Sequence, residues 1–219
     1  MTEIKHPLSV IDGRKVPLKN AFSWVLNYYN PCKRIPEIMP NVLDSTCSKM
    51  IMWHEKDLAM FNVSTNDTNP KIKANTHECC SDLWKFFANQ FFNIAIYDPP
   101  YINLKNRNDS KKYENIFNYN SMPSIKKLGN LTIQSSLSFS KLLKEDGILI
   151  AKITDFHFEK RIRGHYDFIR WFSKYFYLWD IIIYRFYKPI PNLNFYKKRC
   201  AKTHSYFLIF KKKKMIREN

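Results

Sequence analysis

The sequence predicts an α/β fold in which a mostly parallel sheet is covered by helices on both faces. Short apolar runs alternate with longer mixed segments, as expected of successive strand–helix units. Several of the intervening segments carry apolar residues at helical spacing, and no internal repeat is present. With 219 residues, 45% of them hydrophobic, the chain can bury one core but not two full-sized ones. We therefore expect one main domain at residues 41–219, preceded by an N-terminal arm at residues 1–40.

Seven apolar runs are predicted to form the strands of this sheet. They lie at residues 41–44, 58–63, 71–74, 92–97, 147–153, 178–186 and 204–211. Helices are expected at residues 82–89, 131–143 and 166–175. The last two strands are joined by a proline-containing segment without helical periodicity, which indicates a hairpin-like return. We therefore expect the final strand to be antiparallel to its neighbours.

The charge of the chain favours a polyanionic partner. Lys and Arg number 36 against 19 Asp and Glu, which leaves a formal net charge of +17. Residues 102–129 form an irregular basic stretch that also contains Tyr113, Phe117 and Tyr119. Candidate nucleic-acid contacts are Lys105, Arg107, Lys111, Lys112, Lys126, Lys127, Arg161 and Arg163. The alternative is a compositional bias of an AT-rich genome that carries no function.

The cysteines predict neither disulfides nor a metal site. Five are present, which is an odd number, and they form no CxxC pair and no pattern with histidines. This usage fits a reducing, cytoplasmic setting. No apolar stretch approaches the length of a membrane span, so we expect no membrane partner.

The strongest chemical signal is the sequence Asp98-Pro99-Pro100-Tyr101, which directly follows an apolar strand. In α/β folds, the carboxyl edge of the sheet is where ligands bind. The prolines lack N–H groups and leave rigid carbonyls to accept hydrogen bonds, and Asp98 adds a charged acceptor. Tyr101 offers a flat face for a base extruded from its stack. In the alternative interpretation, the segment is a proline turn in which Asp98 caps a backbone N–H.

These residues resemble the amino-group nucleic-acid methyltransferases, whose signature is [Asp/Asn/Ser]-Pro-Pro-[Tyr/Phe/Trp], and most closely those of the adenine-N6 type. The resemblance extends over residues 41–211. Residues 41–47 are similar to the first strand and cofactor loop of the family, residues 142–150 to the turn entering strand five, and residues 202–210 to the closing strand. It implies a Rossmann-like class I methyltransferase fold with a seven-stranded, mostly parallel sheet.

The resemblance also implies the cofactor S-adenosyl-L-methionine and its contacts. Asp44 would bind the methionyl part, and Ser45, Thr46 and Cys47 would form the cofactor loop. The family's loop usually contains glycine, and this chain has none there, so the loop must turn differently. Asn62, placed at the end of the second strand, would bind the ribose, with Asn66 and Asp67 as other options. Thr76 would lie near the adenine, and Asp98 would contribute to the same site.

The expected reaction is direct in-line methyl transfer to a base flipped into the Asp-Pro-Pro-Tyr loop. Asp98 and the Pro99 carbonyl would hold the amine protons. By resemblance, the Asp form of the motif favours adenine N6 in DNA. Methylation of a base in tRNA or rRNA, a non-catalytic nucleic-acid-binding subunit, and protein-glutamine methylation stay open as alternatives, as does assembly with a second copy or a partner subunit. The segment Lys152-Ile153-Thr154-Asp155 ends the fifth strand and either faces the base or, through Asp155, caps the next helix.

Overall fold

The computed structural model describes residues 9–35, 37–99, 124–158, 161–185 and 203–214, with only the backbone at 156–158 and 161–163. A seven-stranded sheet has the order β1-β8-β9-β5-β4-β2-β3. Its strands are β1 (Val10–Asp12), β2 (Asn41–Asp44), β3 (Asn62–Thr65), β4 (Phe92–Tyr97), β5 (Leu143–Ile153), β8 (Phe176–Arg185) and β9 (His204–Lys212). The helices are α1 (Leu18–Tyr29), α2 (Glu55–Met60), α4 (Ile125–Leu142), α5 (His165–Phe172) and the short 3-10 helix η1 (Leu83–Lys85). Strands β6 (Phe156–Phe158) and β7 (Arg161–Arg163) form a separate antiparallel pair.

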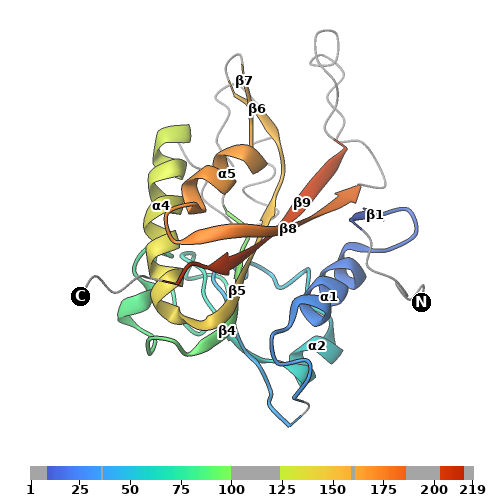
Figure 1. Ribbon diagram of the computed structural model, residues 1–219, viewed down its shortest axis with the longest axis vertical. Helices are drawn as coiled ribbons and strands as arrows, with labels where there is room; N and C mark the ends of the chain where they lie inside the picture. The colour runs from blue at the N-terminus through green and yellow to red at the C-terminus, as the bar shows by residue number, and fades with distance from the viewer. Residues whose placement is uncertain (1–8, 36, 100–123, 159–160, 186–202, 215–219) are drawn as a thin grey trace.

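The strand directions confirm the predicted fold class. Neighbouring strands from β3 to β5 run parallel, as do β1 and β8. Strand β9 is antiparallel to both of its neighbours, β5 and β8. Helices cover both faces, with α4 and α5 on one side of the sheet and α1 and α2 on the other (Figure 1). The result is a three-layer α/β fold.

The two faces of the sheet bury different side chains because successive residues of a strand point to opposite sides. On the α1 face, Ile94 and Ile96 of β4 and Ile148 and Ile150 of β5 pack with Phe22 of α1. On the α4 and α5 face, the alternate residues of the same strands pack against the two helices, including Ala95, Tyr97, Leu149, Ala151, Phe139 and Phe172. All of these side chains are buried, so the central strands are held rigidly from both sides.

The N-terminal segment is part of this architecture. Strand β1 pairs in parallel with β8, with Ile11 opposite Tyr184. Helix α1 buries Phe22, Val25 and Leu26 completely in the core. Residues 10–29 of the expected arm therefore share the sheet and the core with the rest of the chain.

The predicted strand at 71–74 is wrong. Here Asp67 Oδ1 accepts from Asn69 N at 2.8 Å and Asn69 Oδ1 accepts from Lys71 N at 3.0 Å, so Asn and Asp side chains turn the chain locally. A single parallel bridge, Asn66 to Thr76, stands at this edge of the sheet. The seventh strand is β1, at the opposite edge.

Several other boundaries also differ from the prediction, including the start of α4 at Ile125, inside the stretch expected to be irregular, and the start of β5 at Leu143. Residues 58–60 belong to α2, because Asp57 accepts from His54 N at 3.4 Å in its first turn, and β3 begins only at Asn62. The expected helix at 82–89 is reduced to η1. Across the described ranges, no helix is both long and apolar enough to cross a bilayer.

Candidate active site

Three charged side chains lie on adjacent parallel strands at the carboxyl edge of the sheet. Asp44 ends β2, Asp98 follows β4, and Lys152 is the penultimate residue of β5. The strand register brings them together, since Asp44 is opposite Ile96 and Ile96 is opposite Ile150. By alternation, Asp44 and Lys152 face the α1 side, on the same face as Ile94 and Ile150.

Asp98, the first residue after β4, connects that strand end to the loop after β2. Its backbone N–H donates to Thr46 Oγ1 at 2.7 Å, and its Oδ2 accepts from Lys152 Nζ at 3.1 Å. The Asp98 side chain is 25% exposed and that of Lys152 is 11% exposed. A partly accessible carboxylate is therefore fixed at the sheet edge. Pro99 is buried, whereas Pro100 and Tyr101 lie outside the described residues.

Asp44 is a buried carboxylate at the end of β2. Its Oδ2 accepts from Trp53 Nε1 at 2.7 Å and its Oδ1 from Thr46 N at 3.3 Å. Burial, with smaller contributions from the nearby carboxylates of Asp98 and Asp67, raises the pKa of Asp44 to about 7 in spite of these hydrogen bonds. A site of this kind favours a cation, because a positive group stabilises the ionised carboxylate. Trp53 is buried in the core and also positions Asp44.

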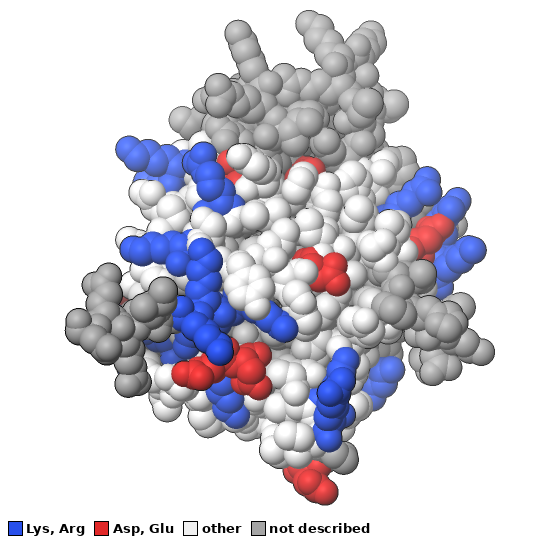
Figure 2. Space-filling model, viewed as in Figure 1, with Lys and Arg blue, Asp and Glu red and all other residues white. Residues whose placement is uncertain are grey.

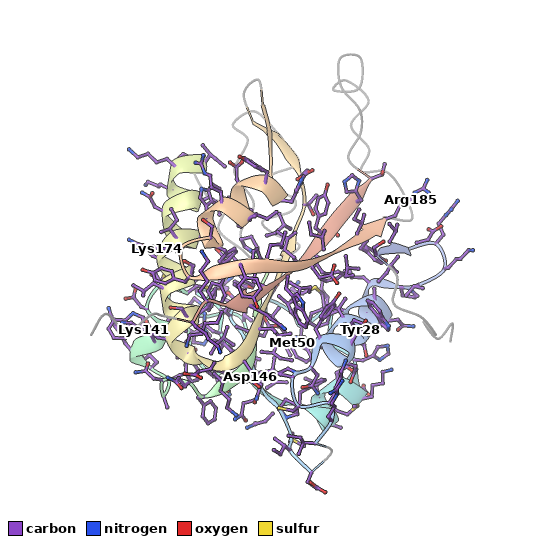
Figure 3. The ribbon with its side chains drawn as sticks, viewed as in Figure 1. Tyr28, Met50, Lys141, Asp146, Lys174 and Arg185 are labelled. Atoms are coloured by element: carbon purple, nitrogen blue, oxygen red, sulfur yellow. The ribbon has the colours of Figure 1, made fainter. Side chains whose placement is uncertain are left out.

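The loop after β2 turns without glycine. Ser45 is completely buried, and its backbone N–H and its hydroxyl both donate to the Ile96 carbonyl, at 3.1 Å and 2.6 Å. Ser48 and Met50 adopt the left-handed φ values of 46° and 54°. Met50, labelled in Figure 3, also packs against the α1-side core. Ordinary residues thus take the conformation that glycine would adopt more easily.

A buried amide at the end of β3 holds the cofactor loop in place. Asn66 Nδ2 donates to the Ser45 carbonyl at 2.9 Å and to the Glu78 carbonyl at 3.0 Å. Its Oδ1 accepts from Thr76 Oγ1 at 2.8 Å and from Glu78 N at 2.9 Å. Cys47 N also donates to the Asn66 carbonyl at 3.0 Å. Asn66 thereby joins three of the predicted residues, Ser45, Cys47 and Thr76, while Thr46 bonds to Asp44 and Asp98.

The strand-end position predicted for Asn62 is wrong. Asn62 begins β3, and its Nδ2 donates to Asn41 Oδ1 at 2.8 Å at the amino edge of the sheet. The carboxyl end of β3 is followed by Asn66 and Asp67, and Asp67 Oδ2 accepts from Ser48 N at 3.0 Å. Asp67 is therefore the acidic group beside the cofactor loop. The error came from treating residues 58–63 as one strand.

Sequence reasoning also missed the role of Lys152 as the partner of Asp98. A single lysine near the end of an otherwise apolar strand was the available signal, because it must reach either solvent or a charge. Asp155, three residues later, has two partners. Its Oδ1 accepts from His165 N at 3.0 Å, and its Oδ2 accepts from Tyr206 Oη at 3.0 Å. Asp155 thus caps the first turn of α5, which matches the second of its two predicted roles.

A close approach fixes the base of the β6–β7 pair beside the site. Gly164 has φ of 140°, and a Cβ there would lie 2.3 Å from Asp155 Oδ1, so only glycine fits. His165 Nδ1 also lies 2.8 Å from Asp155 Oδ1. Burial raises the pKa of Tyr206 to about 12, and the contact with Asp155 contributes. The β6–β7 backbone is therefore anchored directly after β5.

The predicted basic contacts are distributed over several segments. Lys126 and Lys127 are exposed in the first turn of α4, which begins where Ser124 Oγ accepts from Lys127 N at 3.2 Å. Arg161 and Arg163 lie on β7, and their side chains are outside the described part of the chain, as are residues Lys105, Arg107, Lys111 and Lys112. Figure 2 shows Lys and Arg side chains on the side of the molecule that carries α4 and also on the opposite side.

Comparisons with known proteins agree with the fold. No family model and no curated protein matches the sequence. Among solved structures, the 1,6-didemethyltoxoflavin-N1-methyltransferase of Burkholderia thailandensis, crystallised with S-adenosylhomocysteine, is similar at a TM-score of 0.50 and 12% identity, over 92% of this chain and 80% of that one. A SAM-dependent methyltransferase from Archaeoglobus fulgidus is similar at a TM-score of 0.51 and 12% identity, over 90% and 93% of the two chains.

A putative DNA modification methylase from Thermus thermophilus also matches, with 12% identity over 83% of this chain and 56% of that one. Its TM-score of 0.41 is too low to support an inference about the substrate. The two stronger matches and the strand order agree on the architecture. The chain has the Rossmann-like fold of class I S-adenosyl-L-methionine-dependent methyltransferases.

Proposed function

We propose that this chain transfers the methyl group of S-adenosyl-L-methionine to an exocyclic amino group of a nucleic-acid base, with adenine N6 in DNA as the leading substrate. The observation that carries the proposal is the position of Asp98. It follows β4 at the carboxyl edge, it is partly exposed, and its backbone is bonded to Thr46 of the loop after β2. An amine acceptor and a cofactor loop in direct contact are what methyl transfer to an amine requires.

The residues around the loop after β2 suit the charges of the cofactor. Asp44 is a carboxylate whose pKa is raised chiefly by burial, so a nearby cation would stabilise its ionised form, and the methionyl end of S-adenosyl-L-methionine carries an ammonium beside a sulfonium. Asp67, at the end of β3, has the chemistry to accept hydrogen bonds from the ribose hydroxyls. Thr76 is held next to the same loop through Asn66. When bound, the cofactor supplies an electrophilic methyl group.

The protein's own contribution is to orient the amine. Asp98 and the Pro99 carbonyl accept hydrogen bonds from the two amine protons, which points the nitrogen lone pair away from them and towards the methyl donor. The methyl group that the bound cofactor would supply would pass to the amine nitrogen, with S-adenosylhomocysteine as the other product, while Asp98 and the Pro99 carbonyl hold the amine in place. The methylated amine then loses one proton to solvent past Asp98. Tyr101 would stack on the base by family resemblance.

Nucleic acid is favoured over a small-molecule amine by the charge of the chain. The net charge is +17, and Lys126 and Lys127 are exposed at the start of α4. Helix α4 follows β4 and the catalytic-loop segment in the chain, so its first turn lies at the edge of the sheet that carries Asp98. Lysines in this position are suited to contact phosphates.

Nucleoside mass spectrometry tests the proposal directly. Purified protein and isotopically labelled S-adenosyl-L-methionine are incubated separately with unmethylated genomic DNA and with total RNA, and Asp98→Ala serves as the control. Labelled N6-methyladenine in DNA, absent with the variant, is the expected result. Label confined to RNA would replace the DNA assignment with the RNA alternative. Neither label nor measurable cofactor binding would instead identify a non-catalytic subunit.

A further inference from the structure

We propose that Lys152 selects the target base by donating a hydrogen bond to the ring nitrogen next to the amine, which is N1 in adenine. This inference rests on the proposed function and adds a specificity-determining residue to it. The base would be read by a pair of groups, with Asp98 accepting from the amine and Lys152 donating to the neighbouring ring atom. Asp98 alone would accept a hydrogen bond from any amine.

The geometry of the pair supports this role. Lys152 Nζ lies 3.1 Å from Asp98 Oδ2, and the alternation of β5 places the lysine on the face that also carries Asp44. Only 11% of the Lys152 side chain is exposed, and the ammonium lies at the same strand end as the catalytic-loop segment. A base that reaches Asp98 must therefore bring the atoms beside its amine close to Lys152.

The donor and acceptor order of the pair matches some bases and not others. A carboxylate has about four lone-pair sites, so Asp98 can accept from Lys152 and from an amine together. Adenine presents an N6 amine next to the acceptor N1, and cytosine an N4 amine next to the acceptor N3. Guanine presents an N2 amine next to the donor N1–H on the same edge, which an ammonium would repel. The pair thus favours adenine and cytosine over guanine.

The opposite end of the same strands shows that a strand-end lysine alone does not require a carboxylate. Lys144, in the second position of β5, donates from Nζ to Asn93 Oδ1 of β4 at 3.3 Å. That neutral amide satisfies the lysine without a second charge. Removing two charges from water is costly, so the charged partner at the carboxyl edge is better explained by recognition than by packing.

A rival role for Lys152 is purely electrostatic, in which it only keeps Asp98 ionised and in position. The two roles differ in their dependence on the base. An electrostatic role lowers the rate equally for any substrate when the lysine is removed. A hydrogen bond to N1 makes the loss depend on whether N1 is present.

The experiment is a double-mutant cycle between the enzyme and the base. The specificity constant kcat/KM is measured for wild type and Lys152→Met with a DNA oligonucleotide carrying adenine at the target position, and with the same oligonucleotide carrying 1-deazaadenine. The oligonucleotide sequence is taken from DNA that the wild type methylates. Lys144→Met is the matched control, because it makes the same chemical change at the amino edge. Thermal unfolding and cofactor affinity of both variants are measured alongside to check folding.

We expect the wild type and Lys144→Met to prefer adenine over 1-deazaadenine by about 10- to 100-fold, the effect of one hydrogen bond from a charged donor. Lys152→Met should show no preference, with the loss confined to the adenine substrate. Equal preference in wild type and Lys152→Met would overturn the role of Lys152 while leaving the proposed function intact. Failure of the wild type to methylate adenine at all would instead refute the proposed function and this inference with it.

Discussion

The two ends of the central strands carry very different chemistry. At the amino edge, Asn93 Oδ1 accepts from Asn41 N at 3.0 Å and from Lys144 Nζ at 3.3 Å, and Asn62 bonds to Asn41. At the carboxyl edge, the same strands end in Asp44, Asp98 and Lys152, with Asp67 beyond β3. In Figure 3, Asp146 marks the amino end of β5 and Arg185 marks the carboxyl end of β8.

This difference distinguishes the side chains that folding requires at a strand end from those that a binding site would require. Neutral amides are sufficient to close the strand ends, as the amino edge shows. The carboxylates of Asp98 and Asp67 lie close enough to raise the pKa of Asp44, and this repulsion together with the burial of Asp44, which is the larger cause, is a cost to folding. Perturbed pKa values of this kind cluster at functional sites, which makes the carboxyl edge the candidate site.

The largest expected effect comes from replacing a side chain at the carboxyl end of β4 with alanine, compared with the same replacement at its amino end. Asp98→Ala should lower kcat for methyl transfer by about 10³-fold, because the amine loses the charged acceptor that orients it. Asn93→Ala, at the amino end of the same strand, should change kcat by less than about threefold even though it removes hydrogen bonds. Initial rates at saturating cofactor measure both. Similar losses from the two variants would contradict the division between the edges.

The second prediction concerns the pH dependence that Asp44 introduces. Because its pKa is about 7 in the folded protein, against 3.8 for an unperturbed aspartate, the folded protein binds more protons than the unfolded chain between these values. The free energy of unfolding should therefore fall as pH rises from about 4 to about 7, by roughly 4 kcal/mol at most. Cofactor affinity should rise over the upper part of the same range, since only the ionised carboxylate attracts the cationic methionyl end.

Asp44→Asn should remove both trends. Asp57→Asn is the control, because Asp57 of α2 is also buried but accepts a hydrogen bond from Ser23 of α1 rather than from the loop after β2. Denaturant unfolding from about pH 4 to pH 8.5 and titration calorimetry over the upper part of that range measure the two effects. If Asp44→Asn kept the wild-type dependence of cofactor affinity on pH, Asp44 would not be the group that meets the cofactor.

The third prediction compares two asparagines at the ends of β3. Asn66→Ala should lower the free energy of unfolding by about 2–4 kcal/mol, because it leaves buried partners in Ser45 and Glu78 unsatisfied. It should also weaken cofactor binding, since the loop after β2 loses its anchor. Asn62→Ala, exposed at the amino edge, should cost less than about 0.5 kcal/mol and leave the cofactor affinity unchanged. The reverse order would restore Asn62 as the functional residue.

The parts of the fold that the sequence predicted are those with a single dominant signal. Strands β2 and β4 match their predicted bounds, because each is a short apolar run bounded by a charged residue at its carboxyl end. The same signal places Asp44 and Asp98 at strand ends. By contrast, residues 58–60 are apolar enough to resemble a strand, but the acidic first turn at Glu55 and Asp57 starts a helix.

The remaining site residues depend on contacts between distant segments. Lys152 and Asp98 are 54 positions apart in the sequence, and Trp53 meets Asp44 only because the loop folds back onto β2. The sequence pattern of a single segment does not indicate which distant residue each side chain will contact. The predicted strand began about four residues too early, so Asn62 was expected near its carboxyl end although it begins β3. The residues that do follow the carboxyl end, including Asp67, could be identified only from the true start of the strand.

The smallest expected effects come from relieving backbone strain at one left-handed residue on each edge of the sheet. Gln90, just before β4, and Ser48, in the loop after β2, both have left-handed φ values, 54° and 46°. Gln90→Gly should raise the free energy of unfolding by about 0.5–1 kcal/mol, because glycine adopts this conformation without strain. Cofactor affinity should not change, since the side chain of Gln90 is exposed at the amino edge.

Ser48→Gly relieves the same kind of strain but also loosens a loop that must be ordered for binding, so cofactor affinity should fall by a few-fold. Calorimetric titration of both variants, together with their denaturant unfolding, makes the comparison. An unchanged affinity in Ser48→Gly would mean that Asn66 and Asp67 alone order the loop, and that the left-handed serine is tolerated strain rather than a means of holding the loop ready for the cofactor.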